Sequence, residues 1–146
     1  MSSDPEKYTY NTQLRWTSER MGNLSSKDKP DITVATPPEF DGHAGVWSPE
    51  DLFLASVEVC ILTTFLWFVN KEHINLKSYH SGATGTVERV DGKYGFSSID
   101  IELEIKISSN DERLIVEKVL KKVLRACLIS NSIKTVVHIK SKIHVF

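Results

Sequence analysis

Residues 48–70, SPEDLFLASVEVCILTTFLWFVN, form a long and mostly apolar stretch near the centre of a 146-residue chain. Its start is typical of a helix N-terminus. Ser48 can cap the helix, and Pro49 suits the first helical position. Glu50 and Asp51 place negative charge at the positive end of the helix dipole. Because the helix is apolar nearly all round, we expect it to be buried, between two sheets or at a subunit interface.

The same stretch is close to the length that spans a bilayer. Glu58 lies near its middle and argues against a membrane span, because a carboxylate inside a membrane is costly. We therefore expect a central helix of a soluble protein, with no membrane partner.

Strand patterns lie on both sides of this helix. Lys7 to Trp16 alternates, which predicts a half-buried strand, and a short strand is expected at Ile32 to Ala35. After the helix, residues 79–90 and 93–107 predict a β-hairpin joined by Asp91-Gly92, a favoured two-residue turn. Its second arm alternates strictly between isoleucine or leucine and charged residues, which predicts one buried and one solvated face.

The remaining segments complete a simple order of elements. A turn is expected at Met21-Gly22-Asn23, and Ser109 with Glu112 predicts a capping box. The helix after that box carries one apolar stripe: Val116, Val119, Leu120, Val123, Leu124, Cys127 and Leu128. Lys134 to Phe146 predicts a closing strand. Strands, buried helix, hairpin, amphipathic helix and strand together predict one α+β domain over residues 1–146.

Composition limits the class of protein. The net charge of −1 gives no indication of a nucleic-acid partner or an anionic membrane surface. Two cysteines are too few for a secreted disulfide scaffold, and the N-terminus MSSDPEKYTY lacks the features of a signal peptide. The expected compartment is the cytoplasm, where a cysteine is more often kept for its reactivity than for a structural bridge.

The two cysteines are the leading candidates for chemistry. Cys60 lies midway along the apolar helix and Cys127 on the inward stripe of the second helix, so they can meet only if the helices pack together. Inert packing remains open, because free cysteine often fills space in a core. A reactive thiol needs a nearby cation, and Arg20 is a candidate. Glu50 lies about 15 Å from Cys60 along the helix, so a long arginine or a second subunit has to connect them.

The other reactive side chains show no known site pattern. The five histidines, His43, His73, His80, His138 and His144, have no metal-ligand spacing, and no phosphate-binding glycine loop or C-x-x-C motif occurs. We expect neither a metal nor a cofactor.

Three stretches resemble the OsmC/Ohr family, the osmotically inducible protein C and organic hydroperoxide resistance proteins. The first is residues 47–56, with Cys60 ten residues after Glu50. The second is residues 126–132, around Cys127. The third is residues 36–42, the loop before the helix. Arg20-Met21-Gly22 is similar to the Arg-x-Gly of the Ohr branch, although Ser18-Glu19 stands where that branch has a glycine pair. The resemblance covers the chain from about residue 8 to residue 145.

The resemblance implies an intertwined homodimer, with helices between β-sheets and a buried central helix. It also implies a thiol peroxidase. Cys60 would attack the hydroperoxide and form a sulfenic acid, and Cys127 would resolve it to a disulfide. Arg20, held by Glu50, would stabilise the thiolate. The implied substrate is an organic hydroperoxide, with hydrogen peroxide left open, and the implied reductant is an external dithiol, for which a lipoyl-type group is one option. The alternative is a non-catalytic OsmC-like protein that binds an apolar ligand in the dimer groove.

Overall fold

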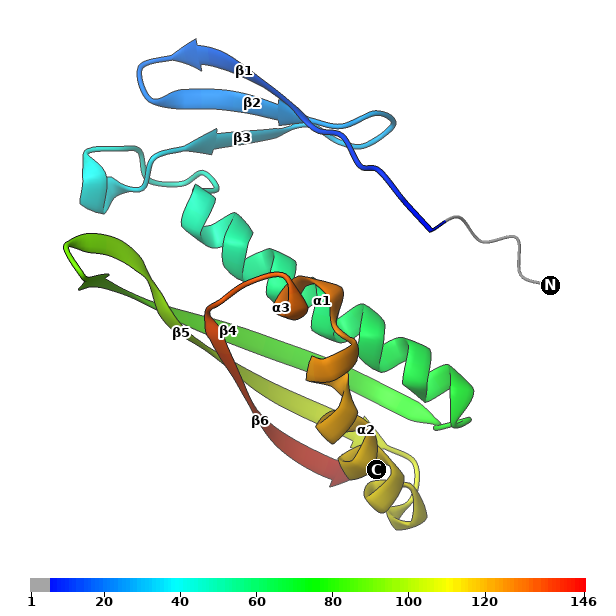
Figure 1. Cartoon of the computed structure of the whole chain (residues 1–146). Helices are drawn as coiled ribbons and strands as arrows, with labels where there is room; N and C mark the ends of the chain where they lie inside the picture. Colours follow the sequence, from blue (N-terminus) through cyan, green and yellow to red (C-terminus); the bar gives the residue numbers. More distant parts are fainter. Residues whose placement is uncertain (1–5) are drawn as a thin grey trace. The chain divides into compact units, whose positions relative to one another are not determined.

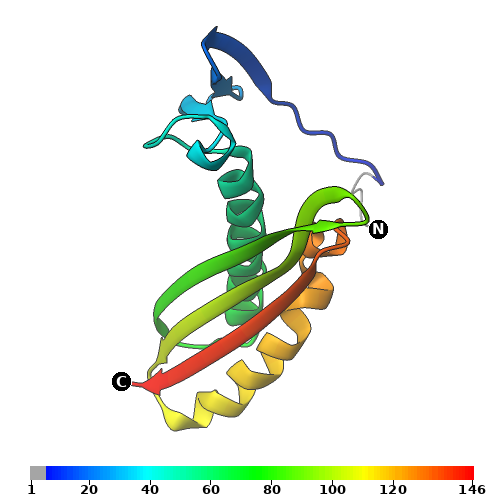
Figure 2. The ribbon, with the colours of Figure 1, turned by 90° about the vertical axis from the view of Figure 1, so that its left-hand side faces the viewer.

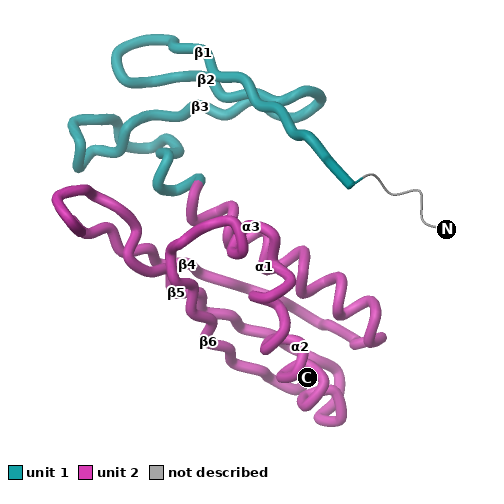
Figure 3. The backbone as a smooth tube through the Cα atoms, in the orientation of Figure 1, with its two compact units in different colours: residues 1–52 teal, residues 53–146 magenta. Residues whose placement is uncertain are grey.

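The computed structural model describes residues 6–146, so residues 1–5 of the N-terminal stretch considered above lie outside the described residues. The chain divides into two compact units, residues 1–52 and residues 53–146 (Figure 3). Each unit is described by itself.

The first unit contains one antiparallel sheet in the order β1-β2-β3. The strands are β1 (Gln13–Ser18), β2 (Met21–Ser25) and β3 (Ile32–Ala35), followed by the short 3-10 helix η1 (Pro38–Phe40). Two predictions are wrong here. The first strand begins at Gln13 rather than Lys7, and all six residues of β1 are exposed, so the strand is not half-buried. The predicted turn at residues 21–23 belongs to β2, since the chain reverses at Glu19, whose φ of 46° is left-handed.

The second unit contains the sheet β4-β5-β6 and the helices that cover it. Its elements are α1 (Pro49–Lys71, which starts in the first unit), β4 (Leu76–Val90), β5 (Lys93–Ile107), η2 (Asn110–Glu112), α2 (Arg113–Ala126), α3 (Leu128–Asn131) and β6 (Val136–Val145). The predicted hairpin is confirmed: β4 and β5 pair antiparallel, and Asp91 and Gly92 both have positive φ. The closing strand β6 pairs with β5 in parallel.

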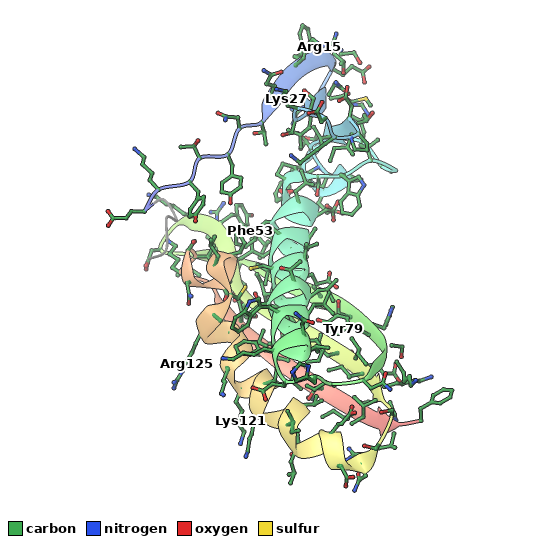
Figure 4. The ribbon with its side chains drawn as sticks, turned by 90° about the vertical axis from the view of Figure 1, so that its right-hand side faces the viewer. Arg15, Lys27, Phe53, Tyr79, Lys121 and Arg125 are labelled. Atoms are coloured by element: carbon green, nitrogen blue, oxygen red, sulfur yellow. The ribbon has the colours of Figure 1, made fainter. Side chains whose placement is uncertain are left out.

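Both long helices lie on the same face of this sheet (Figures 1 and 2). The core between them contains the inward residues of β5, namely Ile99, Ile101, Leu103, Ile105 and Ile107. Val116, Val119 and Val123 of α2 pack on the same core, which confirms the predicted apolar stripe. Lys121 and Arg125 project from the outer side of α2 (Figure 4). Hydrophobic alternation along β5 and the 3.6-residue period of α2 therefore build one two-layer α/β core.

Helix α1 packs on this core through one stripe only. Val57, Ile61 and Phe65 are fully buried, whereas Val59 and Trp67 are 57% and 59% exposed. An 18-residue window of α1 has a mean hydropathy of 2.1, enough for a membrane span by length and composition, and 17% of it is buried within the chain. The core helix of a soluble protein has the same composition. Much of the apolar surface of α1 therefore has no partner within the second unit.

A close approach fixes α1 against the hairpin. A Cβ atom on Gly85 of β4 would lie 2.6 Å from Leu54 Cδ2 and 2.6 Å from Phe96 Cε1. Phe96 in turn stacks on Phe53 of α1, with 4.8 Å between ring centroids. Figure 4 labels Phe53. The absence of a side chain at Gly85 thus lets the start of α1 in this unit pack directly onto the sheet.

The predictions for the two helix starts differ in outcome. At α1 the predicted cap is confirmed, because Asp51 N–H donates to Ser48 Oγ (3.1 Å). Ser48 N–H also donates to the Asp51 carboxylate (3.0 Å), a reciprocal bond that was not predicted. At residue 109 the prediction is wrong, because Ser109 makes no side-chain cap. The Glu112 carboxylate instead accepts hydrogen bonds from Ser108 Oγ and from the backbone N–H of Asn75, so it ties η2 to the segment before β4.

Candidate functional site

Cys60 lies on α1 beside the buried stripe of the helix. It is half-buried and packs against the hydrophobic core of the second unit. One turn further along, the Thr64 hydroxyl lies 4.0 Å from the Cys60 sulfur. The i,i+4 spacing of a helix brings these two side chains together on one face. The sulfur is therefore placed by a rigid helix and has a polar neighbour.

Cys127 lies at a break between α2 and α3. Its φ and ψ of −72° and 112° are extended, so α2 ends at Ala126 and α3 begins at Leu128. The cysteine is fully buried, as predicted, whereas Leu128 is 65% exposed and does not continue the apolar stripe. The break turns the chain sharply at the second thiol, and the direction of the backbone N–H groups changes there.

Hydrogen bonds from the residues after the break stabilise it. The Ser130 hydroxyl donates to the carbonyl oxygens of Leu124 and Cys127, and Asn131 Nδ2 donates to Arg125 O. These bonds satisfy carbonyl groups that a helix C-terminus leaves without partners. The position of Cys127 is thus determined by its own backbone and by the Ser-Asn pair that follows it.

The two thiols interact directly. The Cys60 and Cys127 thiols are near enough for each to shift the pKa of the other. Burial alone would raise the pKa of Cys60. Hydrogen bonds from Cys127, from the backbone N–H groups of Ile129 and Leu128 and from Thr64 outweigh it, so the pKa of Cys60 is lowered. Burial raises the pKa of Cys127, and its donated hydrogen bond to Cys60 raises it further. Cys60 is therefore the thiol that ionises first.

Arg20 and Glu50 belong to the first unit, and the structure does not pair them with each other. Arg20 lies in the turn between β1 and β2, and its Nη1 donates to the carbonyl oxygen of Phe40 (2.9 Å). Among the described residues no carboxylate lies within ion-pair distance of Arg20. Glu50 lies in the first turn of α1, and its Oε2 is buried without a hydrogen-bond partner in residues 6–146. Neither predicted residue thus has an ion-pair partner among the described residues.

Arg20 also borders an apolar groove within the first unit. The groove has a volume of about 570 Å³, and its lining includes Leu14, Trp16, Met21, Leu24, Val34 and Leu52. Arg20 is the one charged residue in this lining. The residues of the first unit therefore place a guanidinium at the edge of an apolar surface.

Sequence reasoning missed three contributors to the thiol site. Thr64 was detectable from its position four residues after Cys60. Ser130 was detectable as a serine three residues after the second cysteine, a spacing that allows a local hydroxyl-to-carbonyl bond. The direction of the N–H groups of Leu128 and Ile129 depends on the backbone angles of Cys127, and no residue pattern predicts those angles. Within residues 6–146 no group of three His, Cys, Asp or Glu residues is arranged to hold a metal ion.

Within residues 6–146, two three-stranded sheets and two long helices define an α+β protein in which Cys60 packs against the core that contains Cys127. The chain belongs to the OsmC-like protein family, which matches residues 42–142. This segment includes Glu50 and both cysteines. The family membership and the α+β fold with two long helices are confirmed as predicted from the sequence, and the intertwined homodimer stays a prediction.

Solved structures show the same fold. An OsmC-like protein of unknown function from Vibrio cholerae superposes with a TM-score of 0.86 at 18% identity, over 93% of this chain and 100% of that one. An organic hydroperoxide resistance protein from Elizabethkingia anophelis gives 0.73 at 18% identity, covering 96% and 98% of the two chains. One from Legionella pneumophila gives 0.68 at 24% identity, covering 95% and 100%. No curated protein matches the chain by sequence.

Proposed function

We propose that this protein is a homodimeric, cytoplasmic thiol peroxidase that reduces organic hydroperoxides. The observation that carries the proposal is the packing of Cys60 and Cys127 in one hydrophobic core, where each thiol shifts the pKa of the other: that of Cys60 is lowered and that of Cys127 is raised. A peroxidase of this type needs one thiol that is readily ionised and a second thiol beside it. Similarity in fold to organic hydroperoxide resistance proteins supports the same substrate class.

The reaction proceeds in three balanced steps. The Cys60 thiolate attacks the terminal oxygen of ROOH, the O–O bond breaks, and the products are Cys60 sulfenic acid and an alkoxide that takes up a proton to become the alcohol. The Cys127 sulfur then attacks the sulfenic sulfur, which forms a disulfide and releases water. An external dithiol, a lipoyl-type group being one candidate, reduces the disulfide by exchange and is itself oxidised.

In this proposal Arg20 stabilises the Cys60 thiolate and Glu50 positions Arg20. The support is that neither side chain has an ion-pair partner within the described residues: Arg20 donates to the carbonyl oxygen of Phe40, and Glu50 has a buried oxygen without a hydrogen-bond partner. A buried carboxylate oxygen without a donor is costly, so an arginine is its natural partner. The assembled site then contains all four residues, Cys60, Cys127, Arg20 and Glu50, in one OsmC-like domain.

The homodimer is proposed from the surface of α1. Val59, Leu66 and Trp67 are exposed large apolar side chains on a helix that buries its opposite stripe in the core. Exposed apolar patches of this kind mark association sites in soluble proteins. A second copy would cover this face of the helix.

The decisive experiment counts thiols and products. Purified protein is mixed with one equivalent of tert-butyl hydroperoxide per chain, and free thiols and tert-butanol are measured. We expect two thiols lost per peroxide and one alcohol formed, with a Cys60–Cys127 disulfide found by peptide mapping. Cys60→Ser should consume no peroxide. Cys127→Ser should complete one turnover and leave a sulfenic acid that dimedone traps. The reverse pattern would exchange the two roles.

A binding function is the alternative, and the apolar groove of the first unit favours it. In that case the cysteines are packing residues, and the groove holds an apolar ligand. Retention of both thiols after peroxide treatment, together with saturable binding of an apolar fluorescent probe that Trp16→Ala weakens, would support binding over peroxidase activity.

A further inference from the structure

Glu19 is engaged by a histidine from a distant loop. His43 Nε2 lies 3.3 Å from Glu19 Oε2, with the two side chains 29% and 73% exposed. The backbone of Glu19 is also held, because its φ is left-handed at 46° and its carbonyl oxygen accepts a 2.9 Å hydrogen bond from Trp16 Nε1. Glu19 immediately precedes Arg20, so its carboxylate is the one nearest to that guanidinium in the sequence.

The loop that carries His43 is folded tightly on itself. His43 N–H donates to Thr36 O (2.9 Å), and Gly42 N–H donates to Pro37 O (3.1 Å). A Cβ atom on Gly42 would lie 1.6 Å from Thr36 O, so only glycine permits this closure. The start of the loop is itself joined to the turn, because Thr36 N–H donates to Arg20 O (3.3 Å). The backbone thus brings the histidine to the turn that contains Glu19 and Arg20.

The two neighbours in the turn therefore point to different partners. Glu19 contacts His43, and Arg20 donates to the uncharged carbonyl oxygen of Phe40. A carboxylate bonded to a guanidinium makes a strong, charge-assisted and often bidentate contact, which would offset much of the cation's effect on a thiolate. The contact with His43 removes the carboxylate most able to do so.

We propose that His43 is a positioning residue that holds Glu19 away from Arg20 and so keeps the guanidinium available for the Cys60 thiolate. This inference rests on the role proposed above for Arg20. It gives roles to His43 and Glu19, which are not among the four predicted site residues. It also accounts for how Arg20 can stabilise the thiolate although Glu19 precedes it directly in the chain.

The test is a rescue experiment on the full-length protein. The variants are His43→Gln, Glu19→Gln, Arg20→Gln and His43→Gln combined with each of the other two. His138→Gln is the control, because His138 is an exposed histidine on β6. Two quantities are measured: kcat/KM with tert-butyl hydroperoxide, and the rate of Cys60 alkylation by iodoacetamide against pH. The alkylation needs no catalytic turnover, so it reports on His43 even if the peroxidase proposal fails.

His43→Gln should lower kcat/KM about three- to fivefold, the scale of an exposed ion pair, and should move the alkylation profile of Cys60 to higher pH. Adding Glu19→Gln should restore both values, because the competing charge is gone. In an Arg20→Gln background, His43→Gln should change nothing further. His138→Gln should behave as the wild type.

Two results would overturn the inference. If His43→Gln combined with Glu19→Gln has a kcat/KM as low as His43→Gln alone, the histidine stabilises only the loop. If Arg20→Gln leaves both quantities unchanged in protein with wild-type thermal stability, Arg20 has no role for His43 to protect. A wild-type protein that consumes no peroxide but whose Cys60 alkylation profile responds to His43→Gln and to rescue would reject the peroxidase while retaining the positioning role.

Discussion

The thiols of Cys60 and Cys127 pack in one core and shift each other's pKa, although the entire β4–β5 hairpin separates the two residues in the sequence. Two chemically identical side chains therefore have different pKa values. Cys60 gains stabilisation of its thiolate from four donors, while Cys127 is fully buried and gives up its proton less readily.

Alkylation should distinguish the two thiols. Because the pKa of Cys60 is lowered and that of Cys127 raised, Cys60 should react with iodoacetamide at lower pH than Cys127. Cys127→Ala removes the neighbouring thiol and should move the alkylation profile of Cys60 to higher pH. Cys127→Ser keeps a hydroxyl at that position and should move the profile less. Peptide mass mapping after alkylation measures this. Earlier labelling of Cys127 would contradict the assignment.

Arg20→Gln should slow peroxide consumption about tenfold, which corresponds to a change of about one pKa unit in a neighbouring acid. Glu50→Gln should produce a smaller loss, because it removes the partner of the cation and leaves the cation in place. Stopped-flow measurement of the first turnover checks both. Arg15→Gln is the matched control, since Arg15 lies on the exposed strand of the same hairpin. Equal losses for Arg15 and Arg20 would argue against a specific role.

Gly85→Ala should destabilise the protein by about 1–3 kcal/mol, the typical cost of overpacking. The new methyl group would lie 2.6 Å from both Leu54 Cδ2 and Phe96 Cε1. Gly82→Ala on the same strand is the control, because nothing lies within 4 Å of its Cβ position. Urea unfolding of the two variants should therefore differ clearly, and similar midpoints would show that α1 yields easily at this contact.

Tyr79 should make stability fall at alkaline pH. Burial, with a further contribution from the charge of Glu58, raises the pKa of Tyr79 from 10.0 to about 12. Between these values the unfolded chain loses the phenol proton and the folded chain keeps it, so stability decreases as pH rises through this window. Tyr79→Phe should lessen the decrease. Chemical unfolding at a series of pH values measures it, and identical slopes for wild type and variant would contradict the prediction.

The chain of 16.5 kDa should sediment as a dimer at micromolar concentration. Val59→Asp should dissociate it, because a carboxylate would replace an exposed apolar side chain on the face of α1 proposed to contact the second copy. Leu114→Asp is the control on α2, with a side chain that is 67% exposed. A wild-type monomer, or dissociation by the control alone, would contradict this interface.

The sequence was sufficient where a regular pattern and a local signal agreed. The start of α1 follows from Ser48 and Asp51, and the buried face of β5 follows from strict alternation, because side-chain direction in a strand has a period of two. The failures come from tertiary context. Strand β2 contains Gly22 and has no alternating pattern, so it resembles a turn until its two neighbours pair with it.

The thiol site shows the same division. The inward position of Cys60 and Cys127 followed from helical periodicity, and their contact with each other agrees with it. The break at Cys127 did not follow, because the apolar stripe continues through Leu128 while the backbone does not. The extended backbone of Cys127 depends on the hydrogen bonds of Ser130 and Asn131. Hydrophobic periodicity does not predict such hydrogen bonds.

The parallel pairing of β6 with β5 bears on the order in which the two cysteines are synthesised. A parallel neighbour requires a crossover, and here the crossover is the segment of α2 and α3 that holds Cys127. During synthesis on the ribosome, Cys60 therefore emerges well before the residue that is its neighbour in the finished fold. An incomplete chain therefore carries Cys60 without Cys127 and without the backbone N–H groups of Leu128 and Ile129, so the pKa of Cys60 is lowered only once the later segment has been made and folded.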